Sequence, residues 1–309
     1  MSVLLASTIG SPDRWIDELR SAIPEEIIRT DPEADDLSDV EVALLAKSVL
    51  GLYPRLPNLK LIIGLQAGVD SLLEDPELPI NIPVTRAGRP SGDQMIAEYV
   101  LLHVLRHHRN MPYFLANQRA GVWNKPDVVM ASERRVGFMG LGIIAMPCAV
   151  MVRDVGFKVA AWTRTPKLVE GIENFCGPDG LGQFLERSDI VVNVLPVTQE
   201  TENILCARNF ALLPEGASVI NIGRGQHVVD EDLIAALDAG HLGSATLDVY
   251  RQEPLPTGHP FWQHPGITLM PHTARKSRPD HVTPQVAENI RRLRAGEPLL
   301  QIVDRTAGY

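Results

Sequence analysis

The sequence predicts an α/β fold made of two Rossmann-like or flavodoxin-like domains, each with a doubly wound parallel sheet, and a cleft between them. Three observations support this prediction. The chain has 309 residues, about twice the roughly 150 residues expected of one domain. Short apolar runs alternate with helical stretches, the pattern of βα units around parallel sheets. A glycine-rich segment at 140–145 joins an apolar run to the start of a helix, as in many doubly wound folds.

The first third of the chain supplies strands and one helix of the first domain. Between its first two apolar runs, Ser11 is suited to cap a helix that has Pro12 in its first position. Trp15, Ile16 and Leu19 fall on one face of that helix, and we expect this face to pack on the sheet. The apolar runs that predict strands here are 3–6, 40–45, 59–63 and 82–84.

A long helix is predicted from Asp93 toward Arg109. Apolar residues recur along this segment at helical spacing, and no proline or glycine interrupts it. Because it follows the last apolar run of the first domain and precedes the second series of runs, we expect it to connect the two domains.

The rest of the chain predicts a second domain and a return to the first. A crossover helix over 231–239 has Asp230 as its N-cap and Gly240 beyond its end. A last helix follows Arg278, and the apolar pair 302–303 is expected to rejoin the first domain. The predicted domains are 1–100 plus 285–309, and 101–284. The strands of the second domain are predicted at 136–139, 158–162, 190–195, 218–222, 245–249 and 267–270.

Composition excludes several classes of protein. Hydrophobic residues make up 45% of the chain and charged residues 22%, which is typical of a globular protein. The formal net charge of −9 argues against nucleic acid as a partner. The N-terminus lacks the pattern of a signal peptide, and no apolar stretch approaches the roughly 20 residues of a membrane span. Cys148, Cys176 and Cys206 show no metal-ligand spacing, so we expect reduced thiols, a cytoplasmic protein and no metal site.

The glycine-rich segment has the pattern G-x-G-x-x-A. It begins Gly140-Leu141-Gly142-Ile143 and ends at Ala145. Glycine lets the backbone turn tightly and approach a pyrophosphate, whose charge lies against the free N–H groups of the helix N-terminus. The same turn also occurs in proteins that bind FAD or S-adenosylmethionine, and in α/β proteins that bind neither.

The end of the next predicted strand bears on the choice of nucleotide. An NAD site expects an Asp or Glu there to bond the ribose 2′-hydroxyl. This chain instead has Thr163, Arg164, Thr165 and Lys167, whose charges and hydroxyls suit a 2′-phosphate. NADPH is therefore the preferred cofactor and NADH remains possible. The alternative is an ordinary solvated basic loop.

Three further polar residues follow predicted strands of the second domain. Arg224 comes after Ile222-Gly223, Glu253 lies in the segment 247–254, and His272 lies in 271–274. The ends of such strands line the ligand crevice of an open parallel sheet. Taken singly, each residue is better explained as a surface ion-pair partner.

Together these motifs resemble those of the D-isomer-specific 2-hydroxyacid dehydrogenases. The motifs N-I-G-R-G, L-D-V-x-x-x-E-P-L-P and P-H-x-A follow G-x-G-x-x-A in the order found in that family. The segments 162–164, 226–230, 260–265 and 303–309 resemble its glyoxylate/hydroxypyruvate reductase A branch in particular. The resemblance implies that 1–100 plus 285–309 bind substrate and that 101–284 bind the dinucleotide.

The resemblance also implies a role for each residue. His272 is the expected general acid, Glu253 orients and charges its ring, and Arg224 binds the substrate carboxylate and polarises the ketone. Backbone N–H groups of Gly68 and Val69 are expected to receive the same carboxylate. Four further residues are expected to line the cofactor: Leu195, Pro196 and Thr201 on the adenosine side, and Asp248 near the nicotinamide amide.

The implied activity is NADPH-dependent reduction of small 2-oxo acids, glyoxylate to glycolate and hydroxypyruvate to D-glycerate. A homodimer, with the connecting helix as its surface, is expected by analogy. Gln66, Arg275 and Lys276 depart from the pattern of the close relatives. The basic pair suits a larger 2-oxo acid or a dicarboxylate, although a solvated basic turn explains it too. A nucleotide-sensing interaction protein on the same fold is the alternative from another class.

Overall fold

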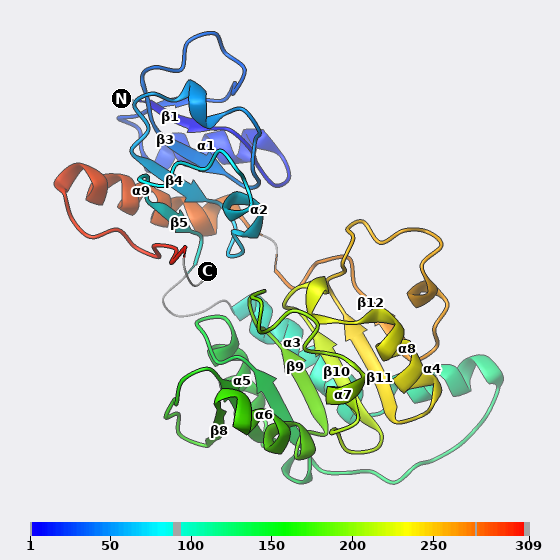
Figure 1. Cartoon of the computed structure of the whole chain (residues 1–309). Helices are drawn as coiled ribbons and strands as arrows, with labels where there is room; N and C mark the ends of the chain where they lie inside the picture. The colour runs from blue at the N-terminus through cyan, green and yellow to red at the C-terminus, as the bar shows by residue number, and fades with distance from the viewer. Residues whose placement is uncertain (1, 89–93, 276, 306–309) are drawn as a thin grey trace. The chain divides into compact units, whose positions relative to one another are not determined.

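The computed structural model describes residues 2–88, 94–275 and 277–305, and the chain divides into two compact units. Unit 1 consists of Met1–Arg89 and Lys276–Tyr309, and unit 2 of Pro90–Arg275. Each unit contains one parallel β-sheet with helices around it (Figure 1). The prediction of two parallel-sheet α/β domains is confirmed.

The boundaries of the units differ from the predicted divisions at 100/101 and 284/285. Helix α3 (Gln94–His108) packs against α5 (Ala145–Asp154) of unit 2, and α9 (Pro279–Ala295) packs against α1 (Pro12–Ala22) of unit 1. Each long helix therefore belongs whole to one unit, and the chain passes between units before the helix begins. The assignment of substrate and dinucleotide to the two domains stays a prediction.

The sheet of unit 1 has five parallel strands in the order β2-β1-β3-β4-β5. All four strands predicted here are present, and β2 was missed because it is short and partly exposed at the sheet edge. A short helix, α2 (Asp70–Leu73), follows β4. The strands are β1 (Ser2–Leu5), β2 (Ile27–Arg29), β3 (Val40–Leu45), β4 (Leu61–Gly64) and β5 (Val84–Arg86).

Helices α1 and α9 cover one face of this sheet. Trp15 and Leu19 of α1 are fully buried, together with Val286 and Ile290 of α9. The predicted helix after Ser11 and the predicted last helix are thus confirmed, although the Ser11 side chain makes no cap hydrogen bond. The tail lies beside β5, where the Val303 N–H donates to the Val84 carbonyl over 2.9 Å.

The sheet of unit 2 has seven parallel strands in the order β12-β11-β10-β9-β6-β7-β8. The chain builds outward from β6 to β8 and then restarts at β9 on the other side of β6, so the strand order reverses there. Ligands bind at such a switch point in open parallel sheets. The strands are β6 (Arg135–Met139), β7 (Lys158–Thr163), β8 (Ile172–Cys176), β9 (Ile190–Asn193), β10 (Ala217–Asn221), β11 (Leu242–Leu247) and β12 (Ile267–Leu269).

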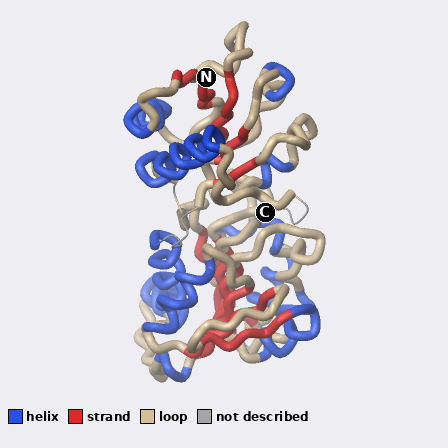
Figure 2. Tube along the Cα trace, turned by 90° about the vertical axis from the view of Figure 1, so that its left-hand side faces the viewer, coloured by secondary structure: helices blue, strands red, loops and turns tan. Residues whose placement is uncertain are grey.

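Helices lie on both faces of the unit 2 sheet (Figure 2). Helices α3 and α5 cover one face, and α6 (Gly177–Glu186) and α8 (Asp230–Asp238) cover the other. Short helix α7 (Ala207–Phe210) packs on α8, and α4 (Met111–Ala120) extends from α3 without burying a single residue. The six predicted strands are present, and the edge strand β8 was missed because only its first residue, Ile172, is buried.

One predicted cap is wrong. Asp230 is the first residue of α8, and the N-cap position belongs to Val229, whose side chain cannot accept a hydrogen bond. Asp230, Glu231 and Asp232 therefore act through the helix dipole, since three acidic side chains lie in its first turn.

Within residues 2–88, 94–275 and 277–305, no helix combines the length and the hydrophobicity needed to cross a bilayer. The same residues contain no group of three or more His, Cys, Asp or Glu side chains arranged to hold a metal ion. Cys148, Cys176 and Cys206 all carry free thiols.

Candidate active site

A histidine–carboxylate pair lies at the carboxyl ends of two adjacent strands of unit 2. Glu253 follows β11 and His272 follows β12, and these strands pair in parallel, so the segments after them meet at one edge of the sheet. The His272 Nδ1–H donates to Glu253 Oε2 over 2.7 Å. The His272 side chain is 48% exposed, which leaves Nε2 accessible to a small ligand.

The pair favours its charged form. The hydrogen bond to Glu253 raises the pKa of His272; burial opposes this rise, and the charges of Glu253 and Asp248 reinforce it. Burial by itself raises the pKa of Glu253, but the bonds from His272 and from the Tyr250 N–H outweigh it and leave that pKa below its ordinary value. Arg224 lowers both pKa values through its positive charge, which puts its guanidinium within electrostatic reach of the pair.

Tyr250 connects the two strand ends that carry the pair. Its main-chain N–H donates to Glu253 Oε1 over 3.0 Å. Its hydroxyl lies 2.8 Å from the carbonyl of Leu247, the last residue of β11, and 2.9 Å from the carbonyl of Met270, the residue after β12. Sequence reasoning did not single out Tyr250, which occupies one of the unspecified positions of L-D-V-x-x-x-E.

Asp248 holds the segment that follows His272. Its carboxylate accepts the N–H groups of Thr273 over 2.8 Å and Ala274 over 2.9 Å, and the Tyr99 hydroxyl over 2.9 Å. The residue is 1% exposed. The expectation that Asp248 also lies near the nicotinamide amide stays a prediction.

Arg224 reaches the pair because of the glycines beside it. A Cβ on Gly225 would overlap the carbonyl carbon of Tyr250, so only glycine lets this loop lie against the segment that leads to Glu253. A Cβ on Gly223 would lie 2.9 Å from the Leu195 carbonyl oxygen. Arg224 Nη1 donates to the Gly223 carbonyl over 2.7 Å. Ile222 and Gly223 thus form the close-packed start of the loop that presents the guanidinium.

A buried polar network holds the loop that carries Arg224. His227 Nε2 donates to the Pro196 carbonyl over 3.1 Å, and its Nδ1 accepts the Arg224 N–H over 3.0 Å. The Asn221 side-chain amide donates to the Arg224 carbonyl over 2.9 Å, and the Asn193 amide donates to Asn221 over 2.9 Å. The network joins the ends of β9 and β10. It could not be predicted from the sequence, because a single histidine outside any motif does not indicate such a network.

The glycine loop after β6 has the geometry of an anion cradle. Gly140 has φ +94°, a conformation that favours glycine, and its N–H donates to the Trp162 carbonyl over 2.9 Å. A Cβ on Gly142 would meet nothing within 4 Å, so space is open beside this residue. Leu141 and Ile143 complete the turn into α5, and Leu195 lies against it, 3.3 Å from the position of a Cβ on Gly140. This loop fits a pyrophosphate at the start of α5.

The basic loop after β7 is tied to the glycine loop. Lys167 Nζ donates to the Leu141 carbonyl over 2.7 Å, so its charge lies beside the turn. Arg164 and Thr165 are exposed, as the sequence reasoning requires of ligands. Thr163 is buried, and its hydroxyl donates to the Thr165 carbonyl over 2.8 Å while accepting from Asn174, so it shapes the loop.

Thr201 supports the loop after β9. It is buried, its hydroxyl donates to the Pro196 carbonyl over 2.7 Å, and it accepts the Thr198 N–H over 2.8 Å. These contacts make Thr201 a brace for Leu195 and Pro196.

The predicted carboxylate loop belongs to unit 1. Gly68 and Val69 follow β4 and precede α2, and the Val69 carbonyl accepts the Leu72 N–H over 2.9 Å. Their role with Arg224 of unit 2 stays a prediction. Arg275 is partly buried, and Lys276 lies outside the described residues.

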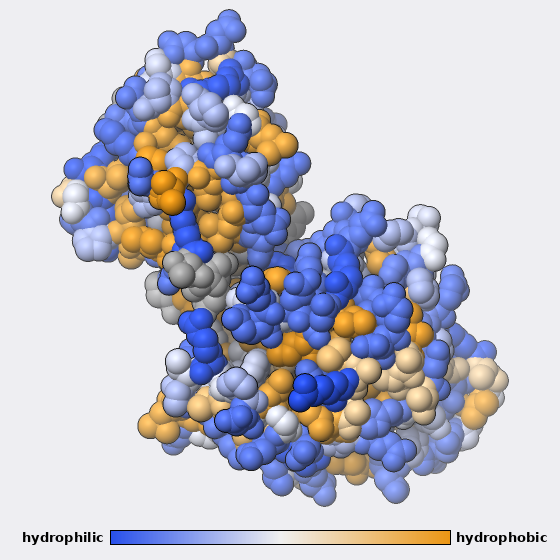
Figure 3. All heavy atoms as spheres, in the orientation of Figure 1, coloured by the Kyte–Doolittle hydropathy of each residue, from blue (hydrophilic) through white to orange (hydrophobic). Residues whose placement is uncertain are grey.

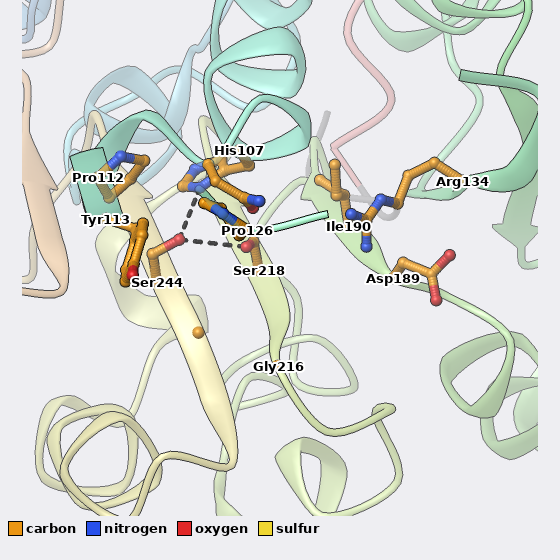
Figure 4. Close-up of a pocket in the computed structure, with 12 residues that line it drawn as sticks. His107, Pro112, Tyr113, Pro126, Arg134, Asp189, Ile190, Gly216, Ser218 and Ser244 are labelled. Carbon is orange, nitrogen blue, oxygen red and sulfur yellow. Dashed lines mark hydrogen bonds between the residues drawn. The ribbon is translucent and has the colours of Figure 1, made fainter. Parts of the chain in front are cut away.

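A cavity of about 340 Å³ in unit 2 lies away from this chemistry. Its lining includes Ile190, Ser218 and Ser244, near the amino ends of β9, β10 and β11, so it opens at the opposite edge of the sheet from His272 (Figure 4). His107 Nδ1 lies 2.8 Å from Ser244 Oγ. We place the active site at the carboxyl edge, because the charged pair and the glycine loop are both there.

Comparisons with known proteins agree with the geometry. Residues 101–274, more than half of the chain, match the family model described as "D-isomer specific 2-hydroxyacid dehydrogenase, NAD binding domain". A glyoxylate/hydroxypyruvate reductase A from Serratia proteamaculans is 33% identical over 314 aligned positions that cover all of both chains. One from Klebsiella pneumoniae is 36% identical and covers 96% of each chain.

Solved structures resemble the whole chain. A D-isomer specific 2-hydroxyacid dehydrogenase from Xanthobacter autotrophicus Py2, in complex with NADPH and MES, has a TM-score of 0.95 at 42% identity, covering 100% of this chain and 99% of that one. An NADPH-dependent glyoxylate/hydroxypyruvate reductase from Sinorhizobium meliloti, with NADP and sulfate, has a TM-score of 0.94 at 33% identity and full coverage of both chains. With the fold, the motifs and these matches in agreement, the chain belongs to the D-isomer specific 2-hydroxyacid dehydrogenase family.

Proposed function

We propose that the protein is an NADPH-dependent reductase of small 2-oxo acids, which converts glyoxylate to glycolate and hydroxypyruvate to D-glycerate. The observation that carries the proposal is the His272–Glu253 pair, held at 2.7 Å beside Arg224. An acid, its orienting carboxylate and a cation for the substrate are the groups that ketone reduction requires. Two relatives described above are glyoxylate/hydroxypyruvate reductases by name.

His272 is the proposed general acid. Its Nδ1–H is engaged by Glu253, so Nε2 is the nitrogen that delivers a proton to the substrate carbonyl oxygen. The raised pKa increases the fraction of protonated ring at any given pH, which favours a loaded acid before reduction begins. When bound, NADPH supplies the hydride that the carbonyl carbon accepts.

Arg224 is the proposed carboxylate ligand. A planar guanidinium forms paired hydrogen bonds with a carboxylate, and its charge stabilises the alkoxide that develops as the ketone is reduced. Its own contact with the Gly223 carbonyl orients the fork. The backbone N–H groups of Gly68 and Val69 are proposed to complete the carboxylate site.

NADPH is the proposed cofactor, with NADH as a weaker alternative. The loop 163–167 contains no carboxylate to repel a 2′-phosphate, and it carries Arg164 on its exposed side and Lys167 beside the glycine loop. Solved relatives contain NADPH or NADP. The residues Gly140 to Ile143 are proposed to receive the pyrophosphate, with Leu195 and Pro196 on the adenosine side and Thr201 as their brace.

The test is the loss of reduced-nicotinamide absorbance with purified protein. NADPH and NADH are each offered with glyoxylate, hydroxypyruvate, pyruvate and oxaloacetate. We expect the fastest loss with NADPH and either of the first two acids. A preference for oxaloacetate would indicate that the substrate is a dicarboxylate. If NADPH binds but its absorbance falls with none of the acids, the protein is better explained as a nucleotide-sensing protein than as a reductase.

We also propose that the protein is a homodimer that associates through α4 and the segment after it. Large apolar side chains are exposed there, among them Phe114, Val122, Trp123, Val128 and Met130, with Trp123 at 89% and Val128 at 77%. Figure 3 shows apolar surface around α4 at the edge of unit 2. Large exposed apolar patches mark interfaces. Residues 111–130 carry two cations and one anion, so two copies meet there without the repulsion expected of a chain with net charge −9.

Light scattering after size exclusion tests the dimer. Trp123→Asp should give a monomer, whereas Ile80→Asp, at a residue of unit 1 that is 83% exposed, should leave the mass unchanged. A monomeric parent chain would contradict the proposal.

The proposed compartment is the cytoplasm, whose reducing conditions suit the three free thiols.

A further inference from the structure

The segment that carries His272 has little regular structure to hold it. It follows β12, a strand of three residues at the edge of the sheet. The chain then leaves unit 2 after Arg275, so no further strand or helix of that unit anchors the segment from its other side. His272 itself has φ +51°, in the left-handed region that non-glycine residues rarely adopt. Side-chain contacts must therefore fix the ring in place.

Asp248 supplies the contacts beyond His272. Its two carboxylate oxygens accept consecutive main-chain N–H groups, Thr273 at 2.8 Å and Ala274 at 2.9 Å. A carboxylate that is 1% exposed needs further donors to offset its lost hydration, and the direction of those donors determines how the carboxylate is turned.

Tyr99 provides such a donor from a different element. Its hydroxyl donates to Asp248 Oδ1 over 2.9 Å, and it lies on α3, which packs against α5 and β9. The Tyr99 ring contacts the His103 ring on the next turn, with centroids 4.5 Å apart. This contact restricts the orientation of the Tyr99 ring and therefore the direction in which its hydroxyl points. Burial and the adjacent Asp248 raise the pKa of Tyr99, so the hydroxyl stays protonated and continues to donate.

We propose that Tyr99 is a positioning residue for the acid of the reaction: through Asp248 it fixes the main chain at Thr273 and Ala274, and thereby keeps His272 against Glu253. The proposal rests on the proposed function only for what His272 does. Its geometry lies wholly within unit 2. Tyr99 touches neither His272 nor Glu253; it acts on the segment through Asp248 and through a second hydrogen bond with the Thr273 side chain.

The titration of His272 in the free protein is the sharpest readout. The charged groups that act on it are Glu253 and Asp248, which raise its pKa, and Arg224, which lowers it. Tyr99→Phe removes one oxygen and keeps the ring. If the segment loosens, the bond to Glu253 is made less often, and the His272 pKa should fall toward its ordinary value.

The experiment compares Tyr99→Phe with Tyr53→Phe, which removes a buried hydroxyl of unit 1 that has no hydrogen-bond partner among the described residues. Histidine NMR titration of the ligand-free chains, with the His272 signal assigned through His272→Gln, should show a lower His272 pKa in Tyr99→Phe only. Amide exchange should be faster at residues 270–275. With NADPH and glyoxylate, kcat should fall roughly tenfold, the effect of losing one hydrogen bond to a charged group, while KM changes little.

An unchanged His272 pKa with unchanged exchange at residues 270–275 would overturn the proposal. The rate of NADPH oxidation is also measured against pH. If Tyr99→Phe lowers only the thermal stability and the fall in rate on the alkaline side stays at the same pH, the proposal is overturned and Tyr99 is purely structural. If Tyr99→Phe folds poorly, Asp248→Asn should speed amide exchange at residues 270–275; only exchange is compared in this variant, because losing the Asp248 charge by itself lowers the His272 pKa. A lower His272 pKa in a chain whose parent reduces no acid would support the positioning role and refute the reductase.

Discussion

Two histidines at opposite edges of the same sheet show what distinguishes the proposed general acid from a structural histidine. His272, at the carboxyl edge, is half exposed and bonded to a carboxylate, which raises its pKa. His107, beside the cavity at the amino edge, is 5% exposed and bonded to the hydroxyls of Ser244 and Thr246. Burial lowers the pKa of His107 to about 3. A polar network next to a cavity is therefore no guide to catalysis unless a charged partner and access to ligand accompany it.

Replacing each histidine should separate catalysis from stability. His272→Gln should lower kcat by roughly 1000-fold while leaving NADPH binding intact, since it removes the proton donor. His107→Gln should leave kcat near that of the parent chain. Steady-state kinetics and NADPH fluorescence titration measure both, and the comparison breaks if the two variants lose activity alike.

Removing the carboxylate should move the pH profile. Glu253→Gln should lower kcat/KM at pH 7.5 by roughly 30-fold, because orientation and charge of the acid are both weakened. The raised pKa keeps His272 protonated to higher pH, and activity is lost as pH rises through that pKa. The alkaline limb should therefore shift to lower pH in the variant. Glu173→Gln, at an ion pair with Arg187, serves as the control.

Changing the basic loop after β7 should alter the affinity for the nucleotide more than the rate of hydride transfer. Arg164→Ala should weaken NADPH binding roughly tenfold and leave NADH binding nearly unchanged, since one charged contact to a 2′-phosphate is lost. Lys125→Ala removes a cation from the segment after α4 and should alter neither affinity. Equal losses for both nucleotides in Arg164→Ala would contradict the assignment of this loop.

The two histidines should also affect stability against pH, with opposite signs. The folded-state pKa of His107, about 3, lies below the ordinary 6.5, so its contribution is present above pH 6.5 and is lost as the pH falls below it. The pKa of His272 is raised, so its contribution is present below pH 6.5 and is lost as the pH rises through the folded-state value. In urea titrations, His107→Ala should lower the free energy of unfolding by about 2–4 kcal/mol near neutral pH and flatten the acid side of the profile.

Much of the fold was predictable because apolar periodicity reports burial. The strands buried on both faces, such as β3 and β10, were predicted to within a residue or two at their ends. The edge strands β2 and β8 were missed, since partial exposure removes the apolar run. The helix start at Asp230 was shifted by one residue, because a cap depends on backbone dihedral angles rather than on residue type alone.

The candidate site was predictable only where a motif names the residue. Arg224, Glu253 and His272 stand in linear motifs at strand ends. Tyr99, Tyr250 and His227, which hold those three in place, lie in no such motif. Their importance depends on which segments meet in space.

The sequence by itself determined the two-domain α/β fold and the glycine turn, and it supplied His272, Glu253 and Arg224 as the candidates for the acid, its carboxylate and the cation. Local patterns suffice for these because strand periodicity, glycine geometry and motif order are all read along one stretch of chain. Only the tertiary structure decided where one unit ends and the next begins, that Thr163 and Thr201 brace loops, and that Asp248 binds the main chain after His272. The reason is physical: a side chain's hydrogen-bond partners are set by distant segments brought together by packing, and sequence separation carries no record of that contact.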